Sequence, residues 1–143
     1  MNIKKVVIGG IVAGVVLNVI DFISNYALAA RMKAETDAFK AGLSDQMAGS
    51  SMVISYIIMD LALGIALVWT YAAIRPRFGP GPRTAAFTAL LFWLLALIFY
   101  SGYRQMGMMS PGLWWTMAFI GLVNFLLASW AGAKVYTEDG TAA

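Results

Sequence analysis

Residues 6–22 read VVIGGIVAGVVLNVIDF, an apolar run interrupted by three glycines, one asparagine and one aspartate. The run continues to residue 30, which is long enough to cross a bilayer, because a transmembrane helix needs about 20 apolar residues. On a helical wheel its small and polar residues fall within an arc of about 80°. These residues are Gly10, Gly14, Asn18, Asp21 and Asn25. Such a face predicts close packing of this helix against protein rather than lipid.

The composition of the whole chain is that of a membrane protein. Of its 143 residues, 61% are hydrophobic and 12% are charged, whereas about a quarter of the residues of soluble domains are charged. There is no cysteine and no histidine, which excludes thiol chemistry, zinc sites built from these residues, His-ligated haem and imidazole catalysis. The net charge of +3 does not predict nucleic-acid binding, because the basic residues lie in short clusters at the ends of apolar segments.

Four segments are long and apolar enough to span a membrane, and they predict an all-α, antiparallel four-helix bundle forming one transmembrane domain, residues 1–143. The segments are residues 6–30, 51–74, 84–103 and 113–135. Prolines and glycines in RPRFGPGPR, residues 75–83, predict the turn between the second and third segments. Ser110 followed by Pro111 predicts the N-cap of the fourth.

The basic residues fall into two sets at opposite ends of the predicted helices. The set beside both termini is Lys4, Lys5, Arg75, Arg77, Arg83 and Lys134, and the opposite set is Arg31, Lys33, Lys40 and Arg104. Six therefore oppose four, and the turn at 75–83 contains no acid. The positive-inside rule predicts that both termini lie in the cytoplasm.

Two segments each allow a second interpretation. The first span could be a cleaved signal peptide, with ALA at 27–29 as the cleavage site, although the polar-interrupted stretch 18–29 is long for the region before such a site. The segment 31–50 could be a mobile polar loop. Alternatively it contains an amphipathic helix on the outer surface, because its apolar residues recur at spacings of seven, four and four. These residues are Met32, Phe39, Leu43 and Met47.

Polar side chains of the spans predict one cluster in the outer half of the bundle. The cluster comprises Asp21, Asp60, Tyr100 and Arg104, with Asn25 on the same face of the first span as Asp21, and with Asn18 and Asn124 deeper in the membrane. At about 1.5 Å per residue, Asp21, Asp60 and Tyr100 lie at one height, and Arg104 lies one turn further out. Each buried aspartate costs roughly 2.5–3.5 kcal/mol on insertion scales. We therefore expect one carboxylate to pair with Arg104 and the other to share or hold a proton. The glycines expected at helix contacts are Gly10, Gly14, Gly64 and Gly121.

Two functional interpretations of this cluster remain open. The first is that its hydrogen bonds hold the helices together in a non-enzymatic structural or accessory membrane component. The second is a small proton- or cation-coupled transporter in which Asp21 and Asp60 carry the ion. The two aspartates could act as acid and base, but no nucleophile–base pair, metal-ligand set or phosphate-binding loop accompanies them. No catalytic residue and no cofactor are therefore expected, and the expected partners are the lipid bilayer and either further copies of the chain or a larger membrane complex.

Three methionines follow the third span in QMGMMSPG, residues 105–112. Thioether ligands select Cu(I), so Met106, Met108 and Met109 could form a copper site on the outer face. Methionine is also an ordinary gap-filling residue. The sequence favours this second interpretation, and no metal site is predicted.

The stretch WTYAAIRPRFGPGPRTA, residues 69–85, and the opening stretch 6–22 together resemble a set of small bacterial four-helix membrane proteins. The similarity covers most of the chain in layout and is specific in those two stretches. It implies four spans in a bacterial inner membrane. That group has no assigned activity, so the resemblance adds no catalytic residue.

Overall fold

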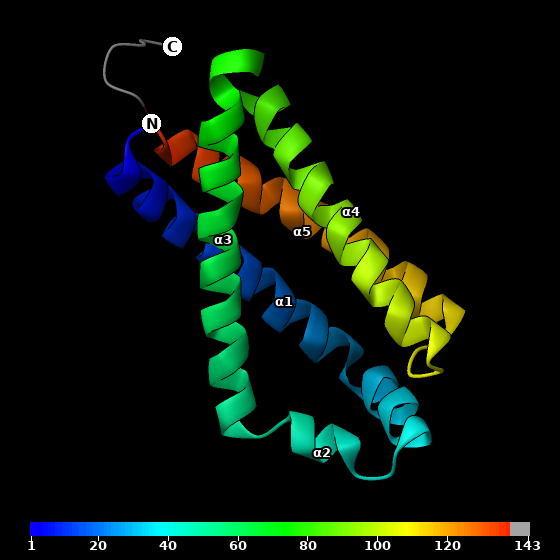
Figure 1. Ribbon diagram of the computed structural model, residues 1–143. Helices are drawn as coiled ribbons and strands as arrows, with labels where there is room; N and C mark the ends of the chain where they lie inside the picture. Colours follow the sequence, from blue (N-terminus) through cyan, green and yellow to red (C-terminus); the bar gives the residue numbers. More distant parts are fainter. Residues whose placement is uncertain (138–143) are drawn as a thin grey trace.

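The computed structural model describes residues 1–137, which contain five α-helices and no strand (Figure 1). The helices are α1 (Ile3–Phe39), α2 (Leu43–Met47), α3 (Ser50–Phe78), α4 (Pro82–Gln105) and α5 (Pro111–Val135). All except α2 are long and apolar enough to cross a membrane. The prediction of an all-α chain with four long apolar helices is therefore confirmed.

Two helix boundaries differ from the sequence prediction. Helix α1 does not end near residue 30 but continues to Phe39. Helix α3 continues through Pro76 to Phe78, so the reversal begins later than residue 75, at Gly79 and Gly81, which have φ of +82° and +120°. A proline so near the end of a helix is tolerated because it removes only one hydrogen bond of the last turns. The predicted N-cap of α5 is confirmed, since the Ser110 hydroxyl accepts a hydrogen bond from the Leu113 N–H at 3.2 Å.

Helix α1 packs against both α3 and α5, α4 packs against α5, and α3 makes smaller contacts with α4 and α5. Figure 1 shows α3 meeting α4 at the turn that joins them and diverging from it toward α2. Asn2 and Tyr136 meet at one end of the bundle, where the Asn2 N–H donates to the Tyr136 hydroxyl at 3.3 Å. We call this end the terminal end, and the opposite end, which carries α2, the α2 end.

Glycines allow the backbones of α1 and α3 to touch. A Cβ atom added to Gly10 would lie 2.5 Å from the Ile65 Cα, and one added to Gly14 would lie 2.6 Å from the Leu61 Cα. A Cβ atom on Gly64 would meet backbone atoms of both Gly10 and Gly14. Three glycines therefore set the distance at which these two helices cross.

A second glycine contact joins α1 to α5. A Cβ atom on Gly9 would lie 2.8 Å from the Gly132 carbonyl oxygen. Neither glycine is among those that the sequence selected for helix packing. At Gly121, by contrast, an added Cβ atom would lie 3.8 Å from its nearest neighbour, Trp93, which is an ordinary van der Waals distance. The α4–α5 contact therefore does not depend on the small size of Gly121.

Candidate functional site

The centre of the polar cluster is a contact between α1 and α5. The Asn124 side-chain amide donates a hydrogen bond to Asp21 Oδ1 at 2.7 Å. Asn124 is only 4% exposed, and within residues 1–137 its Oδ1 atom has no hydrogen-bond partner. A buried amide that donates to a carboxylate is a strong interhelical link, because the alternative for both groups is an unpaired polar atom in an apolar environment.

Two further members of the predicted cluster lie near this link. The charge of Asp60, on α3, lies within electrostatic range of Asp21, and Tyr100, on α4, lies within range of both. In the part of the chain that the structure describes, the Asp60 side chain forms no hydrogen bond and no ion pair. Among the described residues, neither of these two partly buried carboxylates pairs with a basic side chain.

The structure does not bring Arg104 to these carboxylates. Its guanidinium carbon lies 5.7 Å from the ring centroid of Trp114, on α5. Between residues 1 and 137, no ion pair joins Arg104 to Asp21 or Asp60. A guanidinium over an indole ring is a favourable cation–π contact, and this contact holds the Arg104 side chain at the α2 end of the bundle.

The two other asparagines of α1 have separate roles. The Asn18 amide donates to the Gly14 carbonyl oxygen at 3.0 Å and to the Ile57 carbonyl oxygen of α3 at 3.3 Å. The Asn25 amide donates to the backbone carbonyl of Asp21, within α1, at 2.7 Å. Asn18 therefore links α1 to α3, whereas the hydrogen bond of the Asn25 side chain stays within α1.

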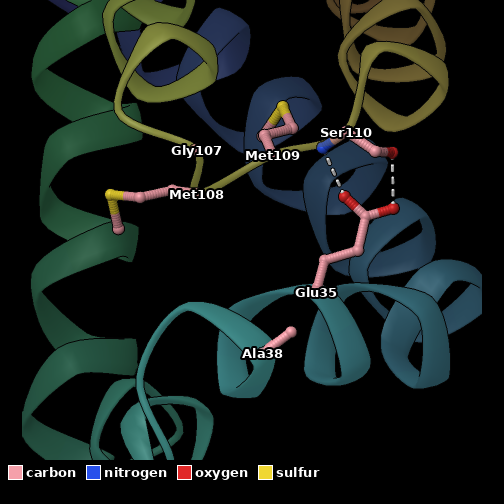
Figure 2. Close-up of a pocket in the computed structure, with 6 residues that line it drawn as sticks. All are labelled: Glu35, Ala38, Gly107, Met108, Met109 and Ser110. Atoms are coloured by element: carbon pink, nitrogen blue, oxygen red, sulfur yellow. Dashed lines mark hydrogen bonds between the residues drawn. The ribbon is translucent and has the colours of Figure 1, made fainter.

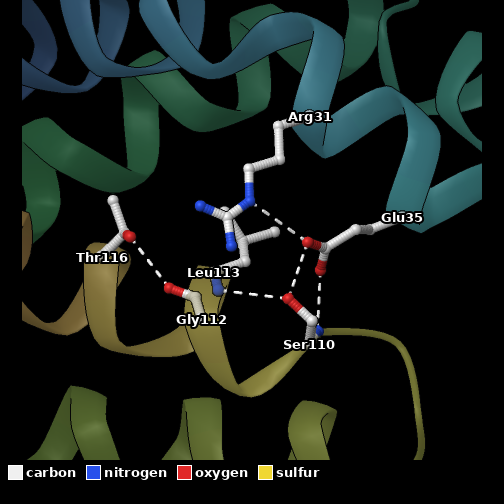
Figure 3. Close-up of polar contacts among 6 residues, drawn as sticks. All are labelled: Arg31, Glu35, Ser110, Gly112, Leu113 and Thr116. Carbon is white, nitrogen blue, oxygen red and sulfur yellow. Dashed lines mark hydrogen bonds and ion pairs between the residues drawn. The ribbon is translucent and has the colours of Figure 1, made fainter.

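Sequence reasoning missed a polar contact at the α2 end, shown in Figure 3. The Glu35 carboxylate accepts hydrogen bonds from the N–H and the hydroxyl of Ser110, each at 2.7 Å, and from Arg31 Nε at 3.3 Å. Because Glu35 meets the first residues of α5, its negative charge also lies at the favourable end of that helix dipole. The signals were present in the sequence as the Arg31–Glu35 spacing of four and the Ser110–Pro111 cap.

The segment between α1 and α3 is ordered by a second set of polar contacts. Asp37 accepts hydrogen bonds from the N–H and the hydroxyl of Ser44, at 3.0 and 2.8 Å, and these bonds lower the pKa of Asp37. Lys33 Nζ lies 3.2 Å from Asp37 and 2.8 Å from Asp45. Gly42, with φ of +76°, separates α1 from α2, so the apolar residues between 32 and 47 do not share one continuous helix.

The methionines at the α2 end do not converge on one point. Met108 and Met109 line a hollow of about 210 Å³ together with Glu35, Ala38, Gly107 and Ser110. Figure 2 shows their sulfur atoms pointing in different directions, and Met106 is exposed. Residues 1–137 also contain no group of three acidic, histidine or cysteine side chains that could hold a metal ion. The geometry therefore does not favour a Cu(I) site.

The Glu35 contact predicts that the stability of the α2 end depends on pH. Glu35 lies beyond residue 30, outside the predicted span. Partial burial raises the pKa of Glu35, but the hydrogen bonds from Ser110 and Arg31 outweigh it and hold the pKa below its usual value of 4.5. A lowered pKa means that the carboxylate stabilises the folded chain above that usual value, and that this contribution is lost as the pH falls through the folded-state pKa.

We expect Glu35→Gln to reduce the hydrogen-exchange protection of the Ser110 amide about tenfold at neutral pH, because a hydrogen bond to a charged group is replaced by a weaker one. In the unmodified chain, the same protection should decline on acidification below pH 4.5. Asp45→Asn is the control, because Asp45 is exposed and its pair with Lys33 contributes little. Equal protection in the Glu35→Gln chain and the unmodified chain would contradict the assignment.

These observations define a class: an all-helical protein whose four long apolar helices suggest a membrane protein. Compared with known proteins, the chain matches no protein-family model, no curated protein and no solved structure. The contacts among its helices therefore carry the functional inference.

Proposed function

We propose that the chain is a non-enzymatic structural or accessory protein of the bacterial inner membrane, with both termini in the cytoplasm. The observation that carries this proposal is the use of buried and partly buried polar side chains as links between helices. Asn124 binds Asp21, Asn18 binds the Ile57 carbonyl, and the Ser129 hydroxyl donates to the Ala85 carbonyl at 2.8 Å. Polar side chains that form hydrogen bonds between helices specify which helices pack together.

An exposed stretch of α3 supports association with other helices. Every residue from 51 to 59 is exposed, because α3 diverges from α4 toward the α2 end (Figure 1). The stretch is rich in large apolar side chains, among them Ile54, Ile58 and Met59. We infer that a second copy of the chain or a subunit of a larger complex packs there, and that lipid covers the remaining apolar faces.

A second candidate function is proton- or cation-coupled transport through Asp21 and Asp60. Two features favour it. Within residues 1–137, Asp60 makes no hydrogen bond or ion pair, and the buried Oδ1 of Asn124 has no partner. Intramembrane acids without a fixed partner are frequent carriers of protons and cations. In this case Asp21 and Asp60 would exchange an ion, and the Asn124 side-chain oxygen would act as a cation ligand or a hydrogen-bond acceptor.

Purification in mild detergent separates these functions. We expect two differently tagged copies of the chain, or one copy and a defined partner, to purify together. The double substitution of Ile54 and Ile58 by glutamine should weaken this association about tenfold, because buried apolar area is lost and two amides must be desolvated. Ile98→Gln on α4 is the matched control, because Ile58 and Ile98 are both 60% exposed.

A chain that purifies alone would contradict the accessory role. Transport would instead be indicated by ion-dependent proton release from the purified chain that disappears in Asp21→Asn and Asp60→Asn. If the unmodified chain releases no protons when ions are added, coupled transport through Asp21 and Asp60 is contradicted.

A further inference from the structure

Among the residues that the structure describes, the terminal end of the bundle is basic. Within residues 1–137, every charged side chain at the ends of α1, α3, α4 and α5 that meet there is basic; these are Lys4, Lys5, Arg75, Arg77, Arg83 and Lys134. Two of them have partners inside the protein, since Lys5 donates to the Thr137 hydroxyl at 2.8 Å and Arg75 lies over the Tyr136 ring at 5.6 Å. Glu138 and Asp139 lie outside the described residues. Arg77 and Arg83, which flank the turn between α3 and α4, are exposed.

Arg83 lies on an aromatic surface. Its guanidinium carbon is 5.6 Å from the ring centroid of Phe87, and that ring meets Phe78 of α3 edge-on, with 5.6 Å between centroids. The Trp130 indole donates to the Pro82 carbonyl oxygen at 3.1 Å, which ties α5 to the same turn. The Phe87 ring orients the guanidinium before any ligand arrives, and the other contacts hold that ring and the turn in place. A planar guanidinium held in this way is suited to a bidentate contact with a phosphate group.

An exposed apolar strip continues from Arg83 along α4. Phe87, Leu91 and Leu95 follow it at steps of four residues, so they lie on the same helix face, and all three are exposed. Twelve residues of helix cover about 18 Å. The hydrocarbon layer of one leaflet is about 15 Å thick, half of the usual core. A cation, an aromatic ring and an aliphatic strip therefore follow one another over the length of one lipid molecule.

We propose that this face of α4, with Arg77 and Arg83 at its basic end, is a binding site for a phospholipid with an anionic headgroup. The phosphate lies at Arg83, and one acyl chain follows Phe87, Leu91 and Leu95. The proposal rests on the membrane location proposed above and adds a lipid class and a position to it. Basic pockets at the cytoplasmic ends of transmembrane helices are suited to anionic headgroups.

The test uses the full chain in neutral detergent, titrated with phosphatidylglycerol or with phosphatidylcholine while its melting temperature is measured. We expect a saturable rise with phosphatidylglycerol and an affinity about tenfold lower for phosphatidylcholine. Arg83→Gln should weaken phosphatidylglycerol binding about tenfold. Arg83→Lys keeps the charge but loses the planar guanidinium, so its affinity should lie between those of the unmodified chain and Arg83→Gln. Lys134→Gln is the matched control because it removes one exposed charge from the same end of the bundle.

Several results would overturn the site. Equal losses in Arg83→Gln and Lys134→Gln would show diffuse attraction instead of a site. Saturation by glycerol phosphate at the same concentration as by the lipid would show that the apolar strip does not contribute. Membrane insertion is tested separately, with topology reporters after residues 40 and 79: an inserted chain that does not distinguish the lipids refutes the lipid site alone, whereas a chain without membrane insertion refutes the proposed function.

Discussion

Gly64→Ala is expected to lower the free energy of unfolding by about 3 kcal/mol, the upper part of the range for overpacked cores. The added methyl group would overlap backbone atoms of Gly10 and Gly14 in α1. Backbone atoms in a helix cannot move aside as the end of a flexible side chain can, so the two helices must separate. Because α1 also contacts α5, this separation should weaken the centre of the whole bundle.

The measurement is unfolding in mixed detergent, followed by the loss of helical circular dichroism. Gly102→Ala is the matched control, because a Cβ atom at Gly102 of α4 has no neighbour within 4 Å. Alanine there should leave stability unchanged or raise it by up to about 1 kcal/mol through its better helix propensity. If Gly64→Ala and Gly102→Ala have the same effect on stability, α1 and α3 do not cross at Gly10, Gly14 and Gly64.

Asn124→Leu is expected to lower the free energy of unfolding by about 2–3 kcal/mol, although leucine is similar in size to asparagine. The substitution removes the amide that donates to Asp21 and leaves a partly buried carboxylate without that hydrogen bond. Losing a hydrogen bond to a charged group has a cost in this range. If the pair is mainly structural, the double variant Asp21→Leu/Asn124→Leu should recover most of the loss, because both polar groups are then gone.

A double-mutant cycle in the same unfolding assay measures this coupling, which we expect to be about 1–3 kcal/mol. Asn25→Leu is the control, because the exposed Asn25 side chain bonds only within α1, and its loss should change stability by no more than about 0.5 kcal/mol. Additive effects of the two single substitutions would show that Asp21 and Asn124 act independently and would remove the main support for the structural role.

Sequence reasoning was reliable where the deciding property is local. The start of α5 follows from the hydroxyl of Ser110 and the fixed φ of the next residue, and the structure has the cap as expected. Reasoning from a local signal was wrong at Pro76, because the cost of a proline depends on how much helix follows it. The end of the predicted span at Ala30 is not the end of α1, because charged residues end an apolar run but a helix can continue into a polar environment.

Comparison of heights along the helices was only partly informative about the polar cluster. It placed Asp21 and Asp60 at one level, which stays a prediction, and the two carboxyl groups lie within electrostatic range of each other. It also placed Arg104 one turn away, but height does not determine the lateral position or the direction of a side chain. The Arg104 guanidinium instead lies over the ring of Trp114, on α5. The Glu35–Ser110 contact joins residues 75 positions apart, a distance over which no local pattern operates.

The sequence by itself determined the helical class and the four long apolar segments, because segment length and hydrophobicity are properties of consecutive residues. It also determined which residues share a helix face, because the helical period is constant. Only the tertiary structure decided which faces meet. Helices α1 and α3 cross at Gly64. The partner of Asp21 is Asn124 of α5 and not Arg104 of α4. Helix crossing is set by close packing between distant segments, and a pattern along one helix does not contain it.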